Sequence, residues 1–230
     1  VVSYFANEVR RRFDSRDVLG DVQEKWLDEK IATGGAARWH LVGQPFLVTP
    51  LSLPDLAPLV AMEGSELMSR SALEGVVSFS QLNPIFLTDS WEGYQNAKAR
   101  FLTQLSNSKS VPVVLTGDIH TAICADLTLE GDVIAHELVT PSISSPGLDQ
   151  IFPSLTPGGV AQGFKEQNPE LRYIDGERRG WLHLDICPEM VKADWRYVST
   201  IQSKDFSSMS GQKAIIHREA AGRAGKLKLI

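Results

Sequence analysis

The segment Gly117-Asp118-Ile119-His120 places two potential metal ligands directly after the apolar run 111–115. A carboxylate supplies a hard oxygen ligand and an imidazole a borderline nitrogen ligand, which together suit Fe, Zn, Mn or Ca. Residues two apart in an extended segment project to the same side, and Gly117 is expected to let the backbone turn sharply beside an ion. The pattern predicts a metal-binding loop. The structural alternative is a turn capped by Asp118 with a partly buried, hydrogen-bonded His120.

The elements around this segment predict an α/β layer. Residues 91–105 carry apolar side chains at helical spacing, and the buried run 111–115 follows them with the character of a strand. Ligand sites in α/β sheets gather beyond the carboxyl ends of the strands. The loop that begins at Gly117 is therefore expected at such an edge.

The rest of the chain predicts short elements without an internal repeat. We expect helices at 2–13 and 21–32, the second with an apolar stripe of Val22, Trp26, Leu27 and Ile31 and an end at Gly34-Gly35. Strands are expected at 39–42 and 46–48, hairpins at 122–129 with 133–139 and at 180–186 with 191–198, and an edge strand at 214–217 before a basic, frayed tail. Residues 49–90 are expected to form a long functional loop or several short elements, and residues 140–159 a loop.

Composition limits the class of protein. The 230 residues are 43% hydrophobic and 22% charged, which is ordinary for a globular domain, and no apolar run is long enough to span a bilayer. The net charge of −5 argues against broad binding to nucleic acid or to anionic membranes. The two cysteines, Cys124 and Cys187, are expected as buried free thiols, although a single disulfide is the alternative.

Six segments carry a resemblance to a known family. They are LGDVQEKWL, DSWEGY, VVLTGDIHTA, ELVTPSISSPG, NPELRYID and RGWLHLDI, between residues 18 and 198. In this order they resemble the alkaline phosphatase D (PhoD-like) family of metallophosphoesterases. The resemblance implies a four-layer α/β/β/α sandwich, hydrolysis of phosphate monoesters or diesters, iron and calcium as metal ions, and an extracytoplasmic location.

The same resemblance implies roles for individual residues. The GDxH segment is the family's last block of metal ligands, so Asp118 and His120 are expected to bind metal and take part in catalysis. In DSWEGY, Asp89 or Glu92 is expected either to bind metal or to orient His120, and Asp89 is the preferred ligand. The alternative is that this segment caps and packs a helix, and the family often has Asp at the position of Glu92, which weakens the ligand reading there.

Other candidates have weaker support. Arg179 is expected to contact phosphate through its two-pronged guanidinium, against the alternative of an ordinary surface arginine. Gln44 occupies a place where related phosphoesterases have a metal-binding histidine, but a turn amide is the simpler interpretation. The remaining histidines are expected to be structural, and the serines at 142, 144 and 145 lack the sequence context of a nucleophile.

The resemblance also implies that part of the metal site is missing. The family's other ligand blocks precede the position of Val1, so the chain is expected to be the C-terminal part of one metallophosphatase domain, with a tail at about 200–230. One edge of its sheet would then be exposed. A phosphate ester is the expected substrate, and the oligomeric state is open. The alternative is a binding or structural domain that keeps the fold without catalysis.

Overall fold

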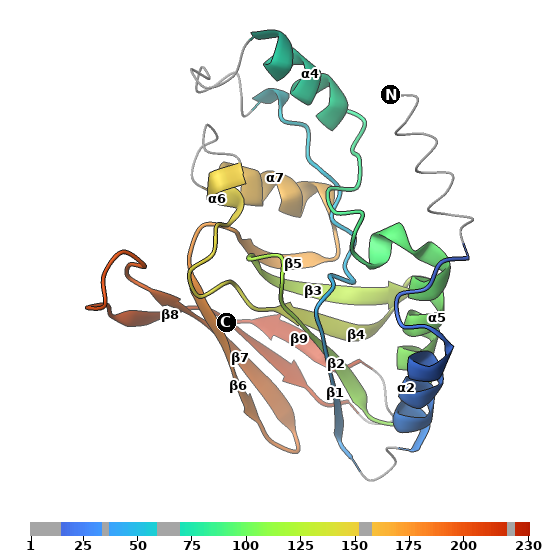
Figure 1. Cartoon of the computed structure of the whole chain (residues 1–230). Helices are drawn as coiled ribbons and strands as arrows, with labels where there is room; N and C mark the ends of the chain where they lie inside the picture. The colour runs from blue at the N-terminus through green and yellow to red at the C-terminus, as the bar shows by residue number, and fades with distance from the viewer. Residues whose placement is uncertain (1–14, 34–36, 59–69, 152–157, 220–223) are drawn as a thin grey trace.

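A computed structural model of the chain describes residues 15–33, 37–58, 70–151, 158–219 and 224–230 (Figure 1). The helices are α2 (Asp21–Thr33), α4 (Arg70–Ser80), the 3-10 turn η1 (Trp91–Gly93), α5 (Gln95–Ser106), α6 (Leu148–Ile151) and α7 (Gly159–Gln167). The strands form two sheets. The structure is thus mixed α/β, as the sequence predicts.

The first sheet has five strands in the order β1-β2-β4-β3-β5. Its strands are β1 (Trp39–Gln44), β2 (Val111–Thr116), β3 (Ala122–Leu129), β4 (Asp132–Val139) and β5 (Leu171–Asp175). β1, β2 and β4 run parallel, whereas β3 is antiparallel to both β4 and β5. The carboxyl ends of β1, β2 and β4 consequently meet at one edge of the sheet.

The second sheet has four antiparallel strands in the order β6-β7-β8-β9. Its strands are β6 (Gly180–Ile186), β7 (Met190–Val198), β8 (Ser208–His217) and β9 (Lys226–Leu229). The predicted strand at 214–217 is the end of β8, which lies between two neighbours. The expectation of an edge strand and a frayed tail is therefore wrong, because β9 pairs with β8 and forms the edge.

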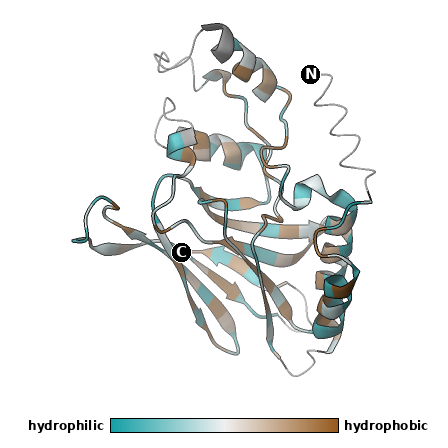
Figure 2. Cartoon of the chain, viewed as in Figure 1, coloured by the Kyte–Doolittle hydropathy of each residue, from teal (hydrophilic) through white to brown (hydrophobic). Residues whose placement is uncertain are grey.

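Three layers pack on one another (Figure 1). The apolar core between the sheets joins residues such as Cys124 and Leu138 to Trp195 and Ile216. On the other face of the first sheet, Phe101 and Leu105 of α5 pack with Leu27 of α2 over strand residues of β2, β3 and β4. Figure 2 shows apolar residues recurring along the strands of both sheets. The described residues therefore form an α/β sandwich with three of the four layers that the resemblance implies.

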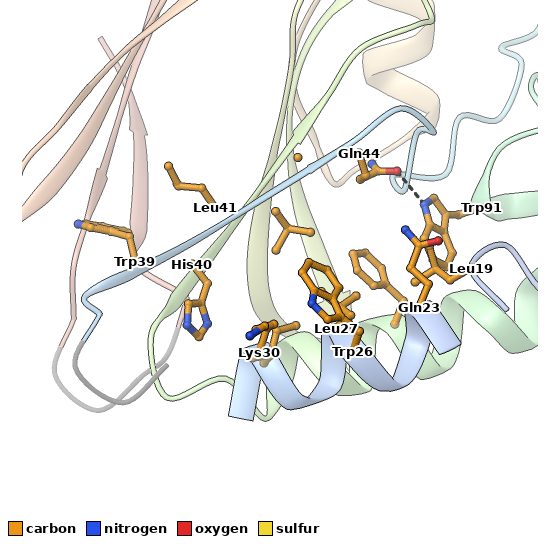
Figure 3. Close-up of a pocket in the computed structure, with 14 residues that line it drawn as sticks. Leu19, Gln23, Trp26, Leu27, Lys30, Trp39, His40, Leu41, Gln44 and Trp91 are labelled. Carbon is orange, nitrogen blue, oxygen red and sulfur yellow. Dashed lines mark hydrogen bonds between the residues drawn. The ribbon is translucent and has the colours of Figure 1, made fainter. Parts of the chain in front are cut away.

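Helix α2 buries less of its predicted stripe than expected. Leu27 and Ile31 are buried, but the side chains of Val22 and Trp26 are 87% and 53% exposed. Trp26 lines an open groove of about 260 Å³ between α2 and β1, the edge strand of the first sheet (Figure 3). The expected exposed edge is present at β1 within the described residues.

Several predicted boundaries change. Residues 46–48 are not a strand, although Leu47 and Val48 are buried, because they cross the end of the sheet to meet β4. The helix at 91–105 is interrupted at Tyr94, where η1 ends and α5 begins. The expected loop at 140–159 contains α6 and the first residue of α7. The predicted helix at 2–13 lies outside the described residues. So does Gly34-Gly35, the expected end of the helix at 21–32.

Both hairpins are confirmed. In the first, Glu130 and Gly131 have φ values of 53° and 91°, as a two-residue turn of the hairpin type requires. The cysteines are free, as expected, but only Cys124 is buried; Cys187 is exposed, so that part of the prediction is wrong. Across the described helices, none has the length and apolar character that a membrane crossing requires.

Candidate metal and phosphate site

Three loops meet where the parallel strands end. Gln44 closes β1 opposite Thr116, which closes β2, and Val139 closes β4 beside Thr116. The Thr140 amide donates to the Thr116 carbonyl at 2.9 Å, which holds the loops after β2 and β4 together. The segment from Gly117 to His120 therefore begins at the expected edge of the sheet.

This segment is a strained turn rather than an extended stretch. The Ile119 amide donates to the Gly117 carbonyl at 2.8 Å, and Asp118 between them has a φ of 67°, which describes a γ-turn of the rare, strained kind. His120 also has a positive φ, 55°. Left-handed conformations at non-glycine residues are uncommon and cluster at functional sites. The sharp turn is made at Asp118 and His120, not at Gly117 as predicted.

His120 has a defined orientation. Its Nδ1 lies 2.8 Å from the Pro146 carbonyl oxygen, in the loop after β4. A carbonyl oxygen only accepts hydrogen bonds, so Nδ1 carries a proton, and in the neutral imidazole Nε2 keeps its lone pair. This is the arrangement in which a histidine binds a metal while its other nitrogen is held by a neighbouring acceptor.

Asp118 offers a free carboxylate. Its side chain is exposed, and no hydrogen bond or ion pair joins it to any other residue that the structure describes. The loops at this edge are held together by a buried residue that the sequence analysis did not single out, Glu137 of β4.

Glu137 is a fully buried carboxylate beneath the loops. Oε1 accepts from the Val48 amide at 3.0 Å and from the Thr116 hydroxyl at 2.6 Å. Oε2 accepts from the Thr49 amide at 2.7 Å and from its hydroxyl at 2.6 Å. Four donors satisfy this carboxylate, and together they fix the ends of β1 and β2 relative to β4. A charged residue among the apolar positions at the buried end of β4 was the available signal.

Gln44 extends this network. Its Nε2 donates to the Thr116 hydroxyl oxygen at 2.7 Å, and its Oε1 accepts from the Trp91 indole at 3.0 Å (Figure 3). Oε1 also accepts from the Phe46 amide at 3.0 Å. Gln44 therefore has the bonding of a turn amide, and it brings the segment around Trp91 to the edge where β1 and β2 end.

The predicted ligand Asp89 precedes this segment. Its side chain is exposed, and Ser90 is the cap: the Ser90 hydroxyl accepts from the Glu92 amide at 3.3 Å. Glu92 is buried and paired with Lys98. Among the described contacts none joins Asp89 to Asp118 or His120. Asp89 lies two residues before Trp91, whose amide donates to the Leu47 carbonyl at 3.2 Å in the loop after β1.

Arg179 lies just before β6 with a side chain only 7% exposed. Its Nε donates to the Ser145 carbonyl at 2.9 Å, and its Nη2 lies 3.0 Å from Asp149 Oδ1. Nη1 donates to the Glu177 carbonyl. Each guanidinium nitrogen thus has a protein partner, and the side chain reaches the same loop that binds His120.

The chain was compared with known proteins. A family model described as PhoD-like phosphatase matches residues 4–195. The chain belongs to the PhoD-like phosphatase family. Alkaline phosphatase D of Bacillus subtilis (strain 168) is 22% identical over 193 residues, which are 80% of this chain and 27% of that protein. A solved structure titled "Structure of PhoD" matches with a TM-score of 0.67 and 17% identity, over 97% of this chain and 36% of that chain. The chain thus spans well under half of each of these two relatives.

The other histidines of this PhoD-like chain have structural partners or lie on the surface. His40 bonds the Ser108 hydroxyl at 2.7 Å, and its burial lowers its pKa. His136 is buried between Asp126 and the Gly225 carbonyl. His183 and His217 belong to the second sheet, and the exposed side chain of His183 lies 3.5 Å from Asp185. The contacts of His40 and His136 agree with their interpretation as structural residues, whereas His183 and His217 are exposed strand residues.

The donor set at the edge suits a metal ion in part. Asp118 presents an unshared carboxylate, and the hydrogen bond to Pro146 leaves Nε2 of His120 available, so both side chains have the chemistry of ligands. Within the described residues, no group of three or more His, Cys, Asp or Glu side chains is arranged to hold an ion. Asp118 and His120 are thus two candidate ligands, fewer than an ion needs.

Proposed function

We propose that the protein hydrolyses phosphate monoesters or diesters at a metal centre to which this chain contributes Asp118 and His120. The observation that carries the proposal is the His120 imidazole, whose Nδ1 donates to the Pro146 carbonyl so that Nε2 is left available two residues after Asp118, which has an exposed carboxylate. Membership of the PhoD-like phosphatase family supports the reaction class.

The metal supplies a water of lowered pKa and positive charge for the phosphoryl oxygens. The chain's own residues orient the ligands. The γ-turn at Asp118 sets the direction of its carboxylate, and the loop after β4 holds the imidazole. Iron and calcium are the ions that the family resemblance implies, and Asp89 is the further ligand that we propose from the neighbouring loop.

We further propose that activity requires polypeptide beyond these 230 residues. Two candidate ligands alone bind a metal weakly, because affinity grows with the number of ligand charges in a rigid site. The chain also covers only 27% of the Bacillus enzyme. The extracytoplasmic location implied by the resemblance stays a prediction, which fractionation of cells that make the protein would test.

The test uses the full-length protein that carries this chain. We expect hydrolysis of a chromogenic phosphodiester or monoester that a chelator abolishes and added metal restores. His120→Ala should lower the bound metal and the rate together, whereas His183→Ala, on an exposed strand position, should change neither. Full metal occupancy in His120→Ala would contradict the ligand assignment. Absence of hydrolysis with every metal would favour a non-catalytic domain that keeps the fold.

A further inference from the structure

The loop after β4 is held from one direction by the start of β6. The Gly180 amide donates to the Ser142 carbonyl at 2.8 Å, and the Arg179 guanidinium donates to the Ser145 carbonyl at 2.9 Å. Inside the loop, the Ser142 hydroxyl donates to the same Ser145 carbonyl at 2.8 Å. The peptide that follows Ser145 carries the Pro146 carbonyl.

The Pro146 carbonyl is the acceptor that fixes His120. It lies 2.8 Å from Nδ1, so it selects the imidazole tautomer protonated at Nδ1. The neighbouring Ser145 carbonyl is the one that Arg179 binds. A shift of the Ser145–Pro146 peptides would therefore move the only described acceptor of the His120 ring.

We propose that Arg179 is a positioning residue: its guanidinium clamps the Ser145–Pro146 loop so that His120 is kept in its Nδ1–H tautomer with Nε2 available. The role builds on the proposed function, in which His120 is a metal ligand. It replaces the predicted phosphate contact with an action through the loop.

Three contacts favour a clamp over a surface phosphate ligand. The side chain is 7% exposed, and its three nitrogens reach the loop, the Glu177 carbonyl and Asp149 in the first turn of α6. The guanidinium of an arginine carries donors on three separate nitrogens in a rigid plane, whereas the three donors of a lysine all leave one nitrogen and cannot span the same positions. A Cβ added to Gly147 would lie 2.3 Å from the Gly176 carbonyl oxygen and 3.3 Å from Arg179 Nη1, so the loop has little room to shift.

The first test reads the tautomer directly. Nitrogen NMR of protein labelled in histidine, well above the imidazole titration range, reports which ring nitrogen carries the proton; the His120 signals are assigned by their loss in His120→Ala. We expect Nδ1 to be protonated in the unmodified chain and a mixture of tautomers in Arg179→Lys. The matched control is Arg178→Lys, whose guanidinium pairs with Asp175 and lies 3.9 Å from the centre of the Tyr197 ring. It should leave His120 unchanged.

A second variant keeps the test decisive if Arg179→Lys does not fold. Asp149→Asn retains Arg179 but removes the charge that lies 3.0 Å from its Nη2, and should move the His120 signals part of the way in the same direction. An unchanged tautomer in a folded Arg179→Lys, or in Asp149→Asn where the former does not fold, would overturn the proposal.

The same variants separate this inference from the proposed function. In the full-length protein we expect Arg179→Lys to weaken Mn²⁺ binding about 10- to 100-fold, the usual effect of losing an outer partner of a metal ligand. If Arg179→Lys shifts the His120 tautomer but the full-length protein hydrolyses no phosphate ester, the result would support the role of Arg179 and contradict the proposed function. A raised KM with an unchanged tautomer and unchanged Mn²⁺ affinity would return Arg179 to phosphate binding and overturn the clamp.

Discussion

The Thr116 hydroxyl donates to the Glu137 carboxylate at 2.6 Å, across the boundary between β2 and β4. Thr116 is the last residue of β2, so this bond lies one residue before the turn that presents Asp118. Because Glu137 also binds the backbone of Val48 and Thr49, a single side chain fixes the approach to three of the loops at the candidate site.

Replacing Glu137 should destabilise the folded protein, because buried hydrogen-bond donors would lose their acceptor. In Glu137→Gln, the amide nitrogen must face one pair of donors that now point at a carboxylate oxygen. Leaving buried donors unsatisfied costs about 1–3 kcal/mol, so we expect a loss of about 2 kcal/mol in the free energy of unfolding, measured with urea. Asp132→Asn, at the exposed start of the same strand, should change it by less than about 0.5 kcal/mol. Equal effects would show that the Glu137 bonds do not stabilise the fold.

Comparing substitutions at Ser90 and Asp89 should show which residue caps the helix and which binds metal. Ser90→Ala removes the hydroxyl that accepts from the Glu92 amide and should cost about 1 kcal/mol of stability. Asp89→Ala should leave stability within about 0.5 kcal/mol, because its side chain is exposed. In the full-length protein, Asp89→Ala should weaken metal binding more than Ser90→Ala does. A larger loss of stability in Asp89→Ala would identify Asp89 as a structural residue instead.

The glycine of the DSWEGY segment is required by close packing. A Cβ at Gly93 would lie 1.9 Å from the Thr88 carbonyl oxygen, which cannot move without shifting the loop that carries Asp89. We expect Gly93→Ala to cost about 3 kcal/mol, at the upper end for overpacking. Gly43→Ala is the control, because a Cβ there meets nothing within 4 Å. A similar melting temperature for both variants would contradict this account.

Local patterns predicted the parts of the fold that depend on neighbours in sequence. The hairpin at Glu130-Gly131 and helix α5 follow from turn residues and helical spacing. Strand β9 was missed because its pairing with β8 depends on a distant part of the chain, and its sequence, KLKL, reads as a charged tail.

The candidate site likewise has one part that local sequence predicts and another that depends on distant residues. The Asp118–His120 segment carries its own signal, a glycine-led Asp-x-His after a buried strand. The partners of Glu137 lie 21 residues away at Thr116 and 88 and 89 residues away at Thr49 and Val48, and the loop that Arg179 binds lies 34 residues away. No local pattern states which distant donors a buried carboxylate or arginine will meet, so their roles needed the tertiary structure.

The cluster around Asp126 should make stability depend on pH. Its Oδ1 lies 2.9 Å from His136 Nδ1, and its Oδ2 accepts from Arg172 Nε at 2.7 Å. Burial acts to raise the pKa of Asp126, but the hydrogen bonds and charges of His136 and Arg172 outweigh it, so the pKa falls below its ordinary value of 3.8. The folded state therefore favours the ionised carboxylate more than the unfolded state does.

The sign of the effect follows from proton binding. Between the lowered folded pKa and 3.8 the unfolded chain binds more protons at Asp126, so this contribution is complete above pH 3.8 and is lost as the pH falls through the folded value. Urea unfolding at a series of acidic pH values should show this loss in the unmodified chain. Asp126→Asn should be less stable at neutral pH and show a flatter decline below pH 3.8, whereas Asp185→Asn, whose side chain is 74% exposed, should keep the original slope. Parallel curves for Asp126→Asn and the unmodified chain would place the acid sensitivity elsewhere.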